Sequence, residues 1–270
     1  MNLRVEEGRI LGLIGPNGAG KTTALNAILG LTPYQGQLNV LGRDPWTERD
    51  LLMRDVCFIA DVAVLPRWIR VSQALDYVAG VHPRFDRAKA EGFLAKTTIR
   101  LASKVRELSK GMVTQLHLAL VMAIDAKLLV LDEPTLGLDI LYRKQFYDSL
   151  LNDYCDRSRT IVVTTHQVEE IQNVLTDVMF IDRGRIVFDC SMEEIEARYL
   201  EVMVHPDQVA AARALKPMHE RQGIGRSILL FDGVDRQQLA GLGEVRTPSV
   251  ADLLVAVMGD RSRQGQGAGQ

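Results

Sequence analysis

A glycine-rich stretch near the start of the chain has the residue types needed to hold a phosphate. It reads Gly-Pro-Asn-Gly-Ala-Gly-Lys-Thr and lies between an apolar run at 10–14 and a helix-like run at 21–29. Glycines let the backbone curl so that successive N–H groups face one anion, and the following helix N-terminus adds partial positive charge. We expect the ammonium of Lys21 to bind nucleotide phosphates and the hydroxyl of Thr22 to ligate Mg²⁺. The expected nucleotide-binding residues are Gly15, Pro16, Asn17, Gly18, Ala19, Gly20, Lys21, Thr22 and Thr23.

Two adjacent carboxylates end a second apolar run, at 128–131. They are Asp132 and Glu133. In proteins with a phosphate loop, an aspartate in this place holds Mg²⁺, so we expect Asp132 to share the metal with Thr22. A glutamate one residue further on can reach the attacking water as general base. An acidic strand end alone is common, but beside a complete phosphate loop it favours a site that holds Mg²⁺ and hydrolyses a nucleotide.

Three further short segments accompany these two in a fixed order. Leu108-Ser109-Lys110-Gly111-Met112 opens a helix before the acidic strand, Leu136-Gly137-Leu138-Asp139 follows that strand, and Thr164-Thr165-His166 ends another strand. The five motifs together resemble the ATP-binding cassette (ABC) family over about residues 8–190. In that family the added three are the signature, the D-loop and the switch histidine.

The resemblance implies a role for each of these residues. Ser109 and Gly111 match the signature positions that contact the γ-phosphate of a nucleotide bound to the opposite subunit. Asp139 belongs with them in the nucleotide site, and His166 is the expected γ-phosphate sensor and, with Lys21 and Glu133, a catalytic residue. The third and fifth signature residues, Lys and Met, stand where the family usually has Gly and Gln. The LSKGM signature and the HPRFD segment at 82–86 resemble an exporter-type bacterial branch.

The resemblance also implies a working assembly. Two cassettes face each other head to tail, each ATP with its Mg²⁺ lying between the phosphate loop of one and the signature of the other. Whether the second cassette is another copy or a sister subunit is left open. The pair would power a separate transmembrane permease from the cytoplasmic face of the plasma (inner) membrane, to which the chain would be peripheral.

Short apolar runs alternate with helix-like runs over most of the chain, which predicts an α/β fold with a mainly parallel sheet. We expect an ABC ATPase domain at 1–195, including a helical subdomain at about 62–125 and a partial antiparallel layer with a strand at 37–41. Residues 196–262 are predicted to form a small C-terminal α/β addition. The polar, glycine-rich residues 263–270 are predicted to be disordered.

The sequence differs from the family pattern at two places, and each difference leads to a further expectation. Asp61 occupies the place of a family glutamine, from which it can approach the metal or the water. No aromatic residue occurs between Met1 and Lys21, where the family has a ring that stacks on adenine, so we expect a shortened N-terminal layer.

The amino-acid composition narrows the classes of function that this chain could have. The 32 basic and 34 acidic residues give a net charge of −2, which argues against nucleic-acid binding. Three widely spaced cysteines fit a cytosolic protein, and no run approaches the ~18 apolar residues of a membrane span.

The alternative function is a soluble ABC ATPase acting on the ribosome or DNA. Such factors usually have two cassettes or a long coiled coil, and this chain shows neither; a kinase would lack the signature and switch histidine.

The missing adenine-stacking ring predicts weak discrimination between bases. Loss of one base–aromatic contact weakens binding by about 1–3 kcal/mol. We therefore expect similar dissociation constants for ATP and GTP in a direct titration, and a strong preference for ATP would contradict this expectation.

Overall fold

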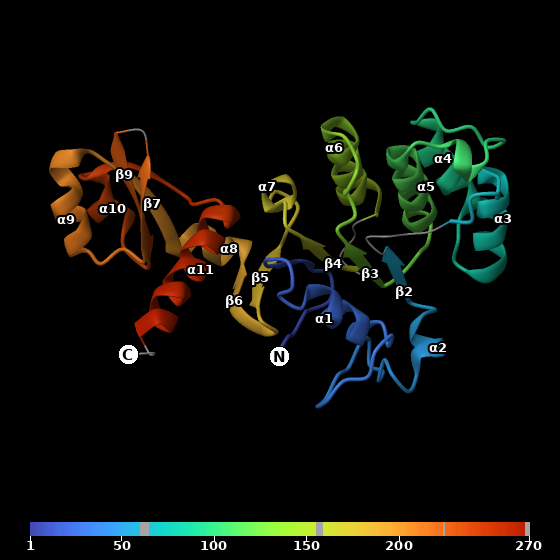
Figure 1. Ribbon diagram of the computed structural model, residues 1–270, viewed down its shortest axis with the longest axis horizontal. Helices are drawn as coiled ribbons and strands as arrows, with labels where there is room; N and C mark the ends of the chain where they lie inside the picture. The colour runs from blue at the N-terminus through green and yellow to red at the C-terminus, as the bar shows by residue number, and fades with distance from the viewer. Residues whose placement is uncertain (60–64, 155–158, 224, 268–270) are drawn as a thin grey trace.

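The chain folds around two β-sheets. The computed structural model describes the backbone of residues 1–59, 65–154, 159–223 and 225–267. The larger sheet has six strands in the order β2-β3-β4-β1-β5-β6 (Figure 1). All neighbours pair in parallel except β5 and β6, so the predicted mainly parallel sheet is confirmed. The strands are β1 (Ile10–Ile14), β2 (Val56–Ile59), β3 (Leu128–Asp132), β4 (Thr160–Thr165), β5 (Asp177–Asp182) and β6 (Arg185–Ser191).

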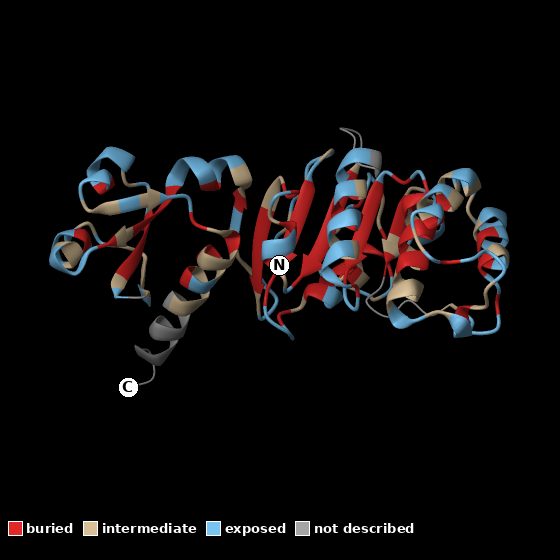
Figure 2. Cartoon of the chain, turned by 90° about the horizontal axis from the view of Figure 1, so that it is seen from above, coloured by how far each residue is buried: buried red, intermediate tan, exposed pale blue. Residues whose placement is uncertain are grey.

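Helices cover both faces of this sheet, and for that reason the central strands are apolar at nearly every position. Figure 2 shows the central strands buried along their length. Leu11 and Leu13 of β1 face a core formed with α1 and α2, whereas Ile10 and Ile14 face a core formed with the other helices. The helices of the two faces are α1 (Lys21–Ile28) and α2 (Arg49–Leu52) on one side, and α5 (Lys110–Met122), α6 (Ile140–Ser149), α7 (Val168–Ile171) and α8 (Met192–Arg198) on the other.

A helical lobe lies at one end of the sheet, beyond β2 (Figure 1). It consists of α3 (Val71–Val81), α4 (Arg87–Ala95), the short helix η1 (Val105–Glu107) and one face of α5. Leu116 and Leu120 of α5 pack into this lobe, while Leu118 and Met122 pack against the sheet. Because α5 is buried on two sides, it ties the lobe firmly to the strands.

A second, antiparallel sheet lies at the opposite end, in the order β10-β7-β9-β8. Alternate residues of β7, including Val202, pack under α9 and α10, and the other face of the sheet meets α11. The elements are β7 (Tyr199–Val204), η3 (Pro206–Gln208), α9 (Val209–Ala214), β8 (His219–Gly223), β9 (Arg226–Asp232), α10 (Arg236–Ala240), β10 (Gly243–Arg246) and α11 (Val250–Gly267).

Helix α11 joins the two sheets. Its residues Val250, Leu253 and Ala256 are buried in the core of the larger sheet, as is Ile195 of α8. The limits 1–195 and 196–262 therefore stay a prediction, because elements on both sides of residue 195 share one core. Like the other helices that the structure describes, α11 is not long and apolar enough to cross a membrane.

One local prediction was wrong. Residues 37–41 do not form a strand: Val40 and Arg43 exchange two backbone hydrogen bonds, of 2.8 and 3.1 Å, across a turn at 41–42, which leaves only an isolated bridge. Helix α11 extends as far as Gly267, and the disorder expected for residues 263–270 stays a prediction. The π-helical turn η2 (Leu150–Tyr154) follows α6 directly.

Burial of Glu201 predicts a measurable contribution to stability. Its side chain is 2% exposed and accepts hydrogen bonds from Arg221 at 2.8 Å and from Arg246 at 3.0 Å. Glu201→Ala removes two charge-assisted hydrogen bonds and leaves arginines that are 39% and 52% exposed, so it should lower the free energy of unfolding in urea by about 2 kcal/mol. Asp232→Ala, which breaks the exposed pair with Arg198, is the control and should cost about 0–1 kcal/mol. Equal costs for the two variants would contradict this.

Candidate active site

The phosphate loop connects the end of β1 to the start of α1 with little conformational freedom. Gly20 has φ 106°, a left-handed conformation that suits glycine. A Cβ atom on Gly15 would lie 2.3 Å from the carbonyl oxygen of Ile181, so a side chain does not fit there. The motif glycines thus allow the loop to bend back over the edge of the sheet, as the sequence predicted.

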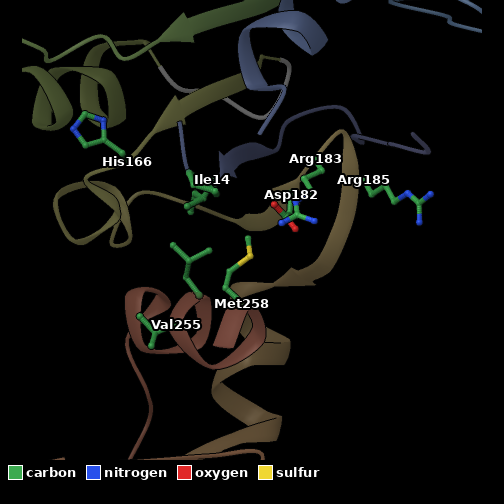
Figure 3. A pocket seen from close by; sticks show the side chains of 10 residues that line it. Ile14, His166, Asp182, Arg183, Arg185, Val255 and Met258 are labelled. Atoms are coloured by element: carbon green, nitrogen blue, oxygen red, sulfur yellow. The ribbon is translucent and has the colours of Figure 1, made fainter. Parts of the chain in front are cut away.

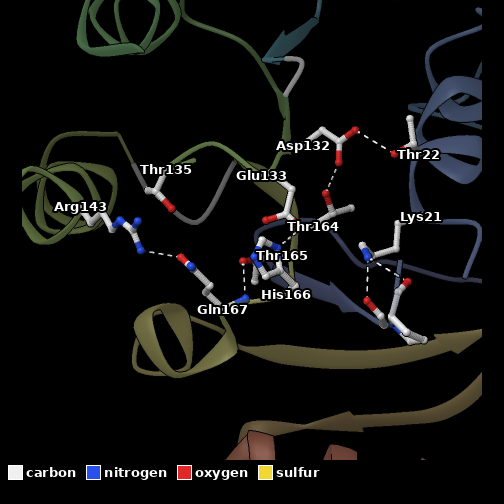
Figure 4. A network of polar contacts seen from close by, with 12 residues as sticks. Lys21, Thr22, Asp132, Glu133, Thr135, Arg143, Thr164, Thr165, His166 and Gln167 are labelled. Atoms are coloured by element: carbon white, nitrogen blue, oxygen red, sulfur yellow. Dashed lines mark hydrogen bonds and ion pairs between the residues drawn. The ribbon is translucent and has the colours of Figure 1, made fainter. Parts of the chain in front are cut away.

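Lys21 is buried within this loop. Its ammonium donates hydrogen bonds to the carbonyl oxygens of Gly15, at 2.6 Å, and Pro16, at 3.3 Å (Figure 4). A cavity of about 250 Å³ opens beside it. The cavity is lined by residues 17–23 of the loop and first turn of α1, together with Asp132 and Glu133. The structure therefore brings together, around one cavity, the predicted loop residues from Asn17 to Thr23 and the acidic pair.

Asp132 lies at the base of this cavity with both carboxylate oxygens engaged. The hydroxyl of Thr22 donates to one oxygen at 3.1 Å, and the hydroxyl of Thr164 donates to the other. Asp132 is buried, so its charge is held close to the loop. A hydroxyl and a carboxylate are hard oxygen donors, and Mg²⁺ is usually held by one or two such groups together with phosphates and water. The two predicted metal ligands Thr22 and Asp132 fit that ion. Asp61 lies outside the described residues.

Glu133 and His166 are in direct contact. The Nδ1 atom of His166 lies 2.9 Å from Oε1 of Glu133, and both side chains come from the carboxyl ends of adjacent strands, β3 and β4. Glu133 has φ 47°, an uncommon conformation for a residue with a side chain. Its N–H donates to the carbonyl of Thr164 at 3.1 Å, which continues the β3–β4 pairing beyond Asp132. This bend turns the carboxylate into the cavity and towards the imidazole.

The signature and D-loop residues lie elsewhere. Ser109 is the N-cap of α5 and accepts a hydrogen bond from the Met112 N–H at 3.2 Å. Gly111 is in the first turn of that helix, and Asp139 caps α6 by accepting from the Tyr142 N–H at 3.0 Å. None of the residues described around the phosphate cavity comes from α5 or α6. The structure therefore does not bring Ser109, Gly111 and Asp139 to the phosphate loop of their own chain.

A larger cavity, of about 990 Å³, begins at the first two residues of the phosphate loop (Figure 3). It lies between the end of β1, the β5–β6 turn and α11. Its lining residues are Ile14, Gly15, Pro16, His166, Asp182, Arg183, Arg185, Leu254, Val255 and Met258. The C-terminal helix thus lines the same cavity as His166, the predicted switch histidine, a proximity that the sequence did not indicate.

The fold and this site define a phosphate-loop nucleotide hydrolase. The family model described as ABC transporter matches residues 1–136. A Nod factor export ATP-binding protein I from Cupriavidus metallidurans is 32% identical over 250 residues, covering 86% of this chain and 79% of that protein. The daunorubicin resistance ATP-binding protein DrrA3 from Streptomyces coeruleorubidus is 30% identical over 229 residues, covering 81% of this chain and 72% of that protein.

A solved structure described as an ATP-binding subunit of an ABC transporter has the same fold. It superposes with a TM-score of 0.65 at 24% identity, covering 72% of this chain and 83% of that one. The chain belongs to the ABC transporter ATP-binding family. It is an ATP-binding protein of a family of ATPases, related to subunits of exporter type.

The position of Lys21 predicts a loss of nucleotide affinity on its removal. Hydrogen bonds to charged groups contribute about 1.5–3 kcal/mol each, so Lys21→Ala should weaken ATP binding at least about tenfold. A titration with a fluorescent ATP analogue measures this directly. Lys144→Ala, an exposed lysine on α6, is the matched control and should bind as wild type. Wild-type affinity in Lys21→Ala would remove the lysine from the phosphate site.

Proposed function

We propose that this chain is the ATP-hydrolysing motor subunit of an exporter, working with a second cassette and a separate transmembrane permease. The observation that carries the catalytic part is the contact of 2.9 Å between Glu133 and His166 beside the phosphate cavity. It places a candidate base and a candidate γ-phosphate sensor next to each other at one edge of the sheet.

In this mechanism the loop N–H groups and the Lys21 ammonium bind the phosphates of ATP. The ammonium leaves the carbonyls of Gly15 and Pro16 to do so. Thr22 and Asp132 would hold Mg²⁺, which would neutralise phosphate charge when bound. The Glu133 carboxylate takes the proton of the attacking water. His166 orients that carboxylate through Nδ1 and is exposed enough to meet the γ-phosphate.

Exposed groups at the tips of α5 and α6 support pairing with a second cassette. Ser109 is exposed and lies outside the phosphate cavity of its own chain. At the start of α6, Ile140 is 84% exposed and Leu141 is 63% exposed, an arrangement that favours contact with another protein. A signature that acts on the nucleotide of the opposite cassette, together with apolar residues beside it, is consistent with an ATP-dependent dimer.

A second set of exposed apolar residues supports docking on a membrane partner. Trp68, Tyr77 and Val81 of the helical lobe are 70%, 66% and 61% exposed. The lobe lies at the end of the larger sheet, away from the C-terminal sheet (Figure 1). The relatives named for Nod factor export and for daunorubicin resistance favour export over import. The chain would then act peripherally on the cytoplasmic face of the membrane.

The base role of Glu133 is tested by Glu133→Gln. General-base catalysis contributes about 10²–10⁴-fold, so phosphate release should fall by at least about a hundredfold while ATP binding persists. The slow variant should also accumulate as a dimer when ATP and Mg²⁺ are present, as measured by light scattering. Glu169→Gln, an exposed acid on α7, should behave as wild type. Hydrolysis by Glu133→Gln at a rate near wild type would exclude Glu133 as the base.

The proposed pairing with a permease is tested by purifying this chain from its native host. A membrane protein that co-purifies stoichiometrically supports the motor assignment. Recovery on ribosomes or DNA, without a membrane protein, would favour the soluble alternative instead.

A further inference from the structure

The guanidinium of Arg143 connects the D-loop to the segment that carries the switch histidine. Its Nε donates to the carbonyl oxygen of Leu138 at 2.8 Å. Its Nη1 donates to Oε1 of Gln167 and to Oε1 of Glu170, each at 2.5 Å. Figure 4 shows the Arg143 side chain reaching from α6 to Gln167. Only 19% of the Arg143 side chain is exposed, and its contacts with Leu138 and Gln167 are partly buried, whereas the contact with Glu170 is exposed.

These contacts complete a closed circuit around the reacting groups. Leu138 lies five residues after Glu133 on the D-loop segment, and Gln167 directly follows His166. The imidazole of His166 then returns to the carboxylate of Glu133. The circuit thus runs from the candidate base along the D-loop to Arg143, across to Gln167, and back through His166.

The chemistry of arginine suits this place. Its planar group presents donors in a fixed fork, so one residue can bind a carbonyl, an amide and a carboxylate at the same time. The single ammonium of a lysine is a point donor and does not span the same three acceptors. Glu170 adds an ion pair that holds the fork against α7.

We propose that Arg143 is a positioning residue for ATP hydrolysis, which fixes the switch segment against the D-loop so that His166 stays in contact with Glu133. This inference rests on the proposed roles of Glu133 and His166. Arg143 is not a catalytic residue, because its contacts are with Leu138, Gln167 and Glu170, outside the residues that line the phosphate cavity.

A purely structural role makes a different prediction. If Arg143 only held α6 to α7, its replacement would lower stability and leave kcat per folded molecule unchanged. A positioning role predicts that kcat falls while the KM for ATP and the dissociation constant of an ATP analogue change little. Lys21 and Asp132, which are proposed to bind phosphate and metal, make their hydrogen bonds to Gly15 and Thr22 and not to Arg143.

The experiment compares Arg143→Gln and Arg143→Lys with wild type and with Lys144→Gln, an exposed residue on the same helix. We expect kcat to fall at least about tenfold in Arg143→Gln, with KM within about twofold. Arg143→Lys should keep the wild-type melting temperature and still show a reduced kcat. In a His166→Ala background, Arg143→Gln should cause little further loss, because groups that act as one unit are not additive.

A spectroscopic readout tests the geometry without relying on activity. With five histidines in the chain, the ring signals of His166 can be assigned in ¹H–¹⁵N spectra by comparison with His166→Ala. We expect these signals to shift in Arg143→Gln and to stay in place in Lys144→Gln. Unchanged His166 signals, or a wild-type kcat in both Arg143 variants, would overturn the proposal. Failure of wild type to hydrolyse ATP would instead overturn the proposed function, and the histidine signals would still test the circuit.

Discussion

The parallel pairing of β3 with β4 is the constraint on which the site depends. Asp132 and Thr164 are register partners in this pair, and the Glu133 N–H extends the pairing by one bond. Because parallel strands end at the same edge of a sheet, the predicted metal ligand Asp132, the candidate base Glu133 and the predicted switch histidine His166 emerge side by side. The neighbouring β1 ends at that edge too and leads into the phosphate loop. A shift in the register of any of these strands would separate groups that are proposed to act on one phosphate.

The sequence indicated which segments meet at the phosphate cavity where each segment is recognisable locally. The phosphate loop depends on glycines and a following helix, and the acidic pair on an apolar strand, all within single short segments. The contact between Glu133 and His166 was not predicted, because it requires the order of strands in the sheet. Arg143 was missed for the same reason: its partners Gln167 and Glu170 lie 24 and 27 residues away along the chain.

The errors in the fold have similar causes. Apolar alternation at 37–41 resembled a strand, but a strand also needs a neighbour with free hydrogen-bonding groups, and a tight turn satisfies those of Val40 instead. Strand β8 was overlooked because its residues, His-Glu-Arg-Gln-Gly, are polar; pairing with β9 at the edge of the second sheet makes it a strand. The two-sided burial of α5 is likewise visible only when both the lobe and the sheet are in place.

The position of Lys21 has a consequence for the energetics of nucleotide capture. Its buried ammonium is bonded to the carbonyl oxygens of Gly15 and Pro16, so the backbone of the loop itself solvates this charge. If Lys21 binds a triphosphate as proposed, it would exchange carbonyl acceptors for phosphate acceptors, and the free energy released would be the difference between two sets of hydrogen bonds. Such an exchange would favour reversible binding of the nucleotide over very tight retention.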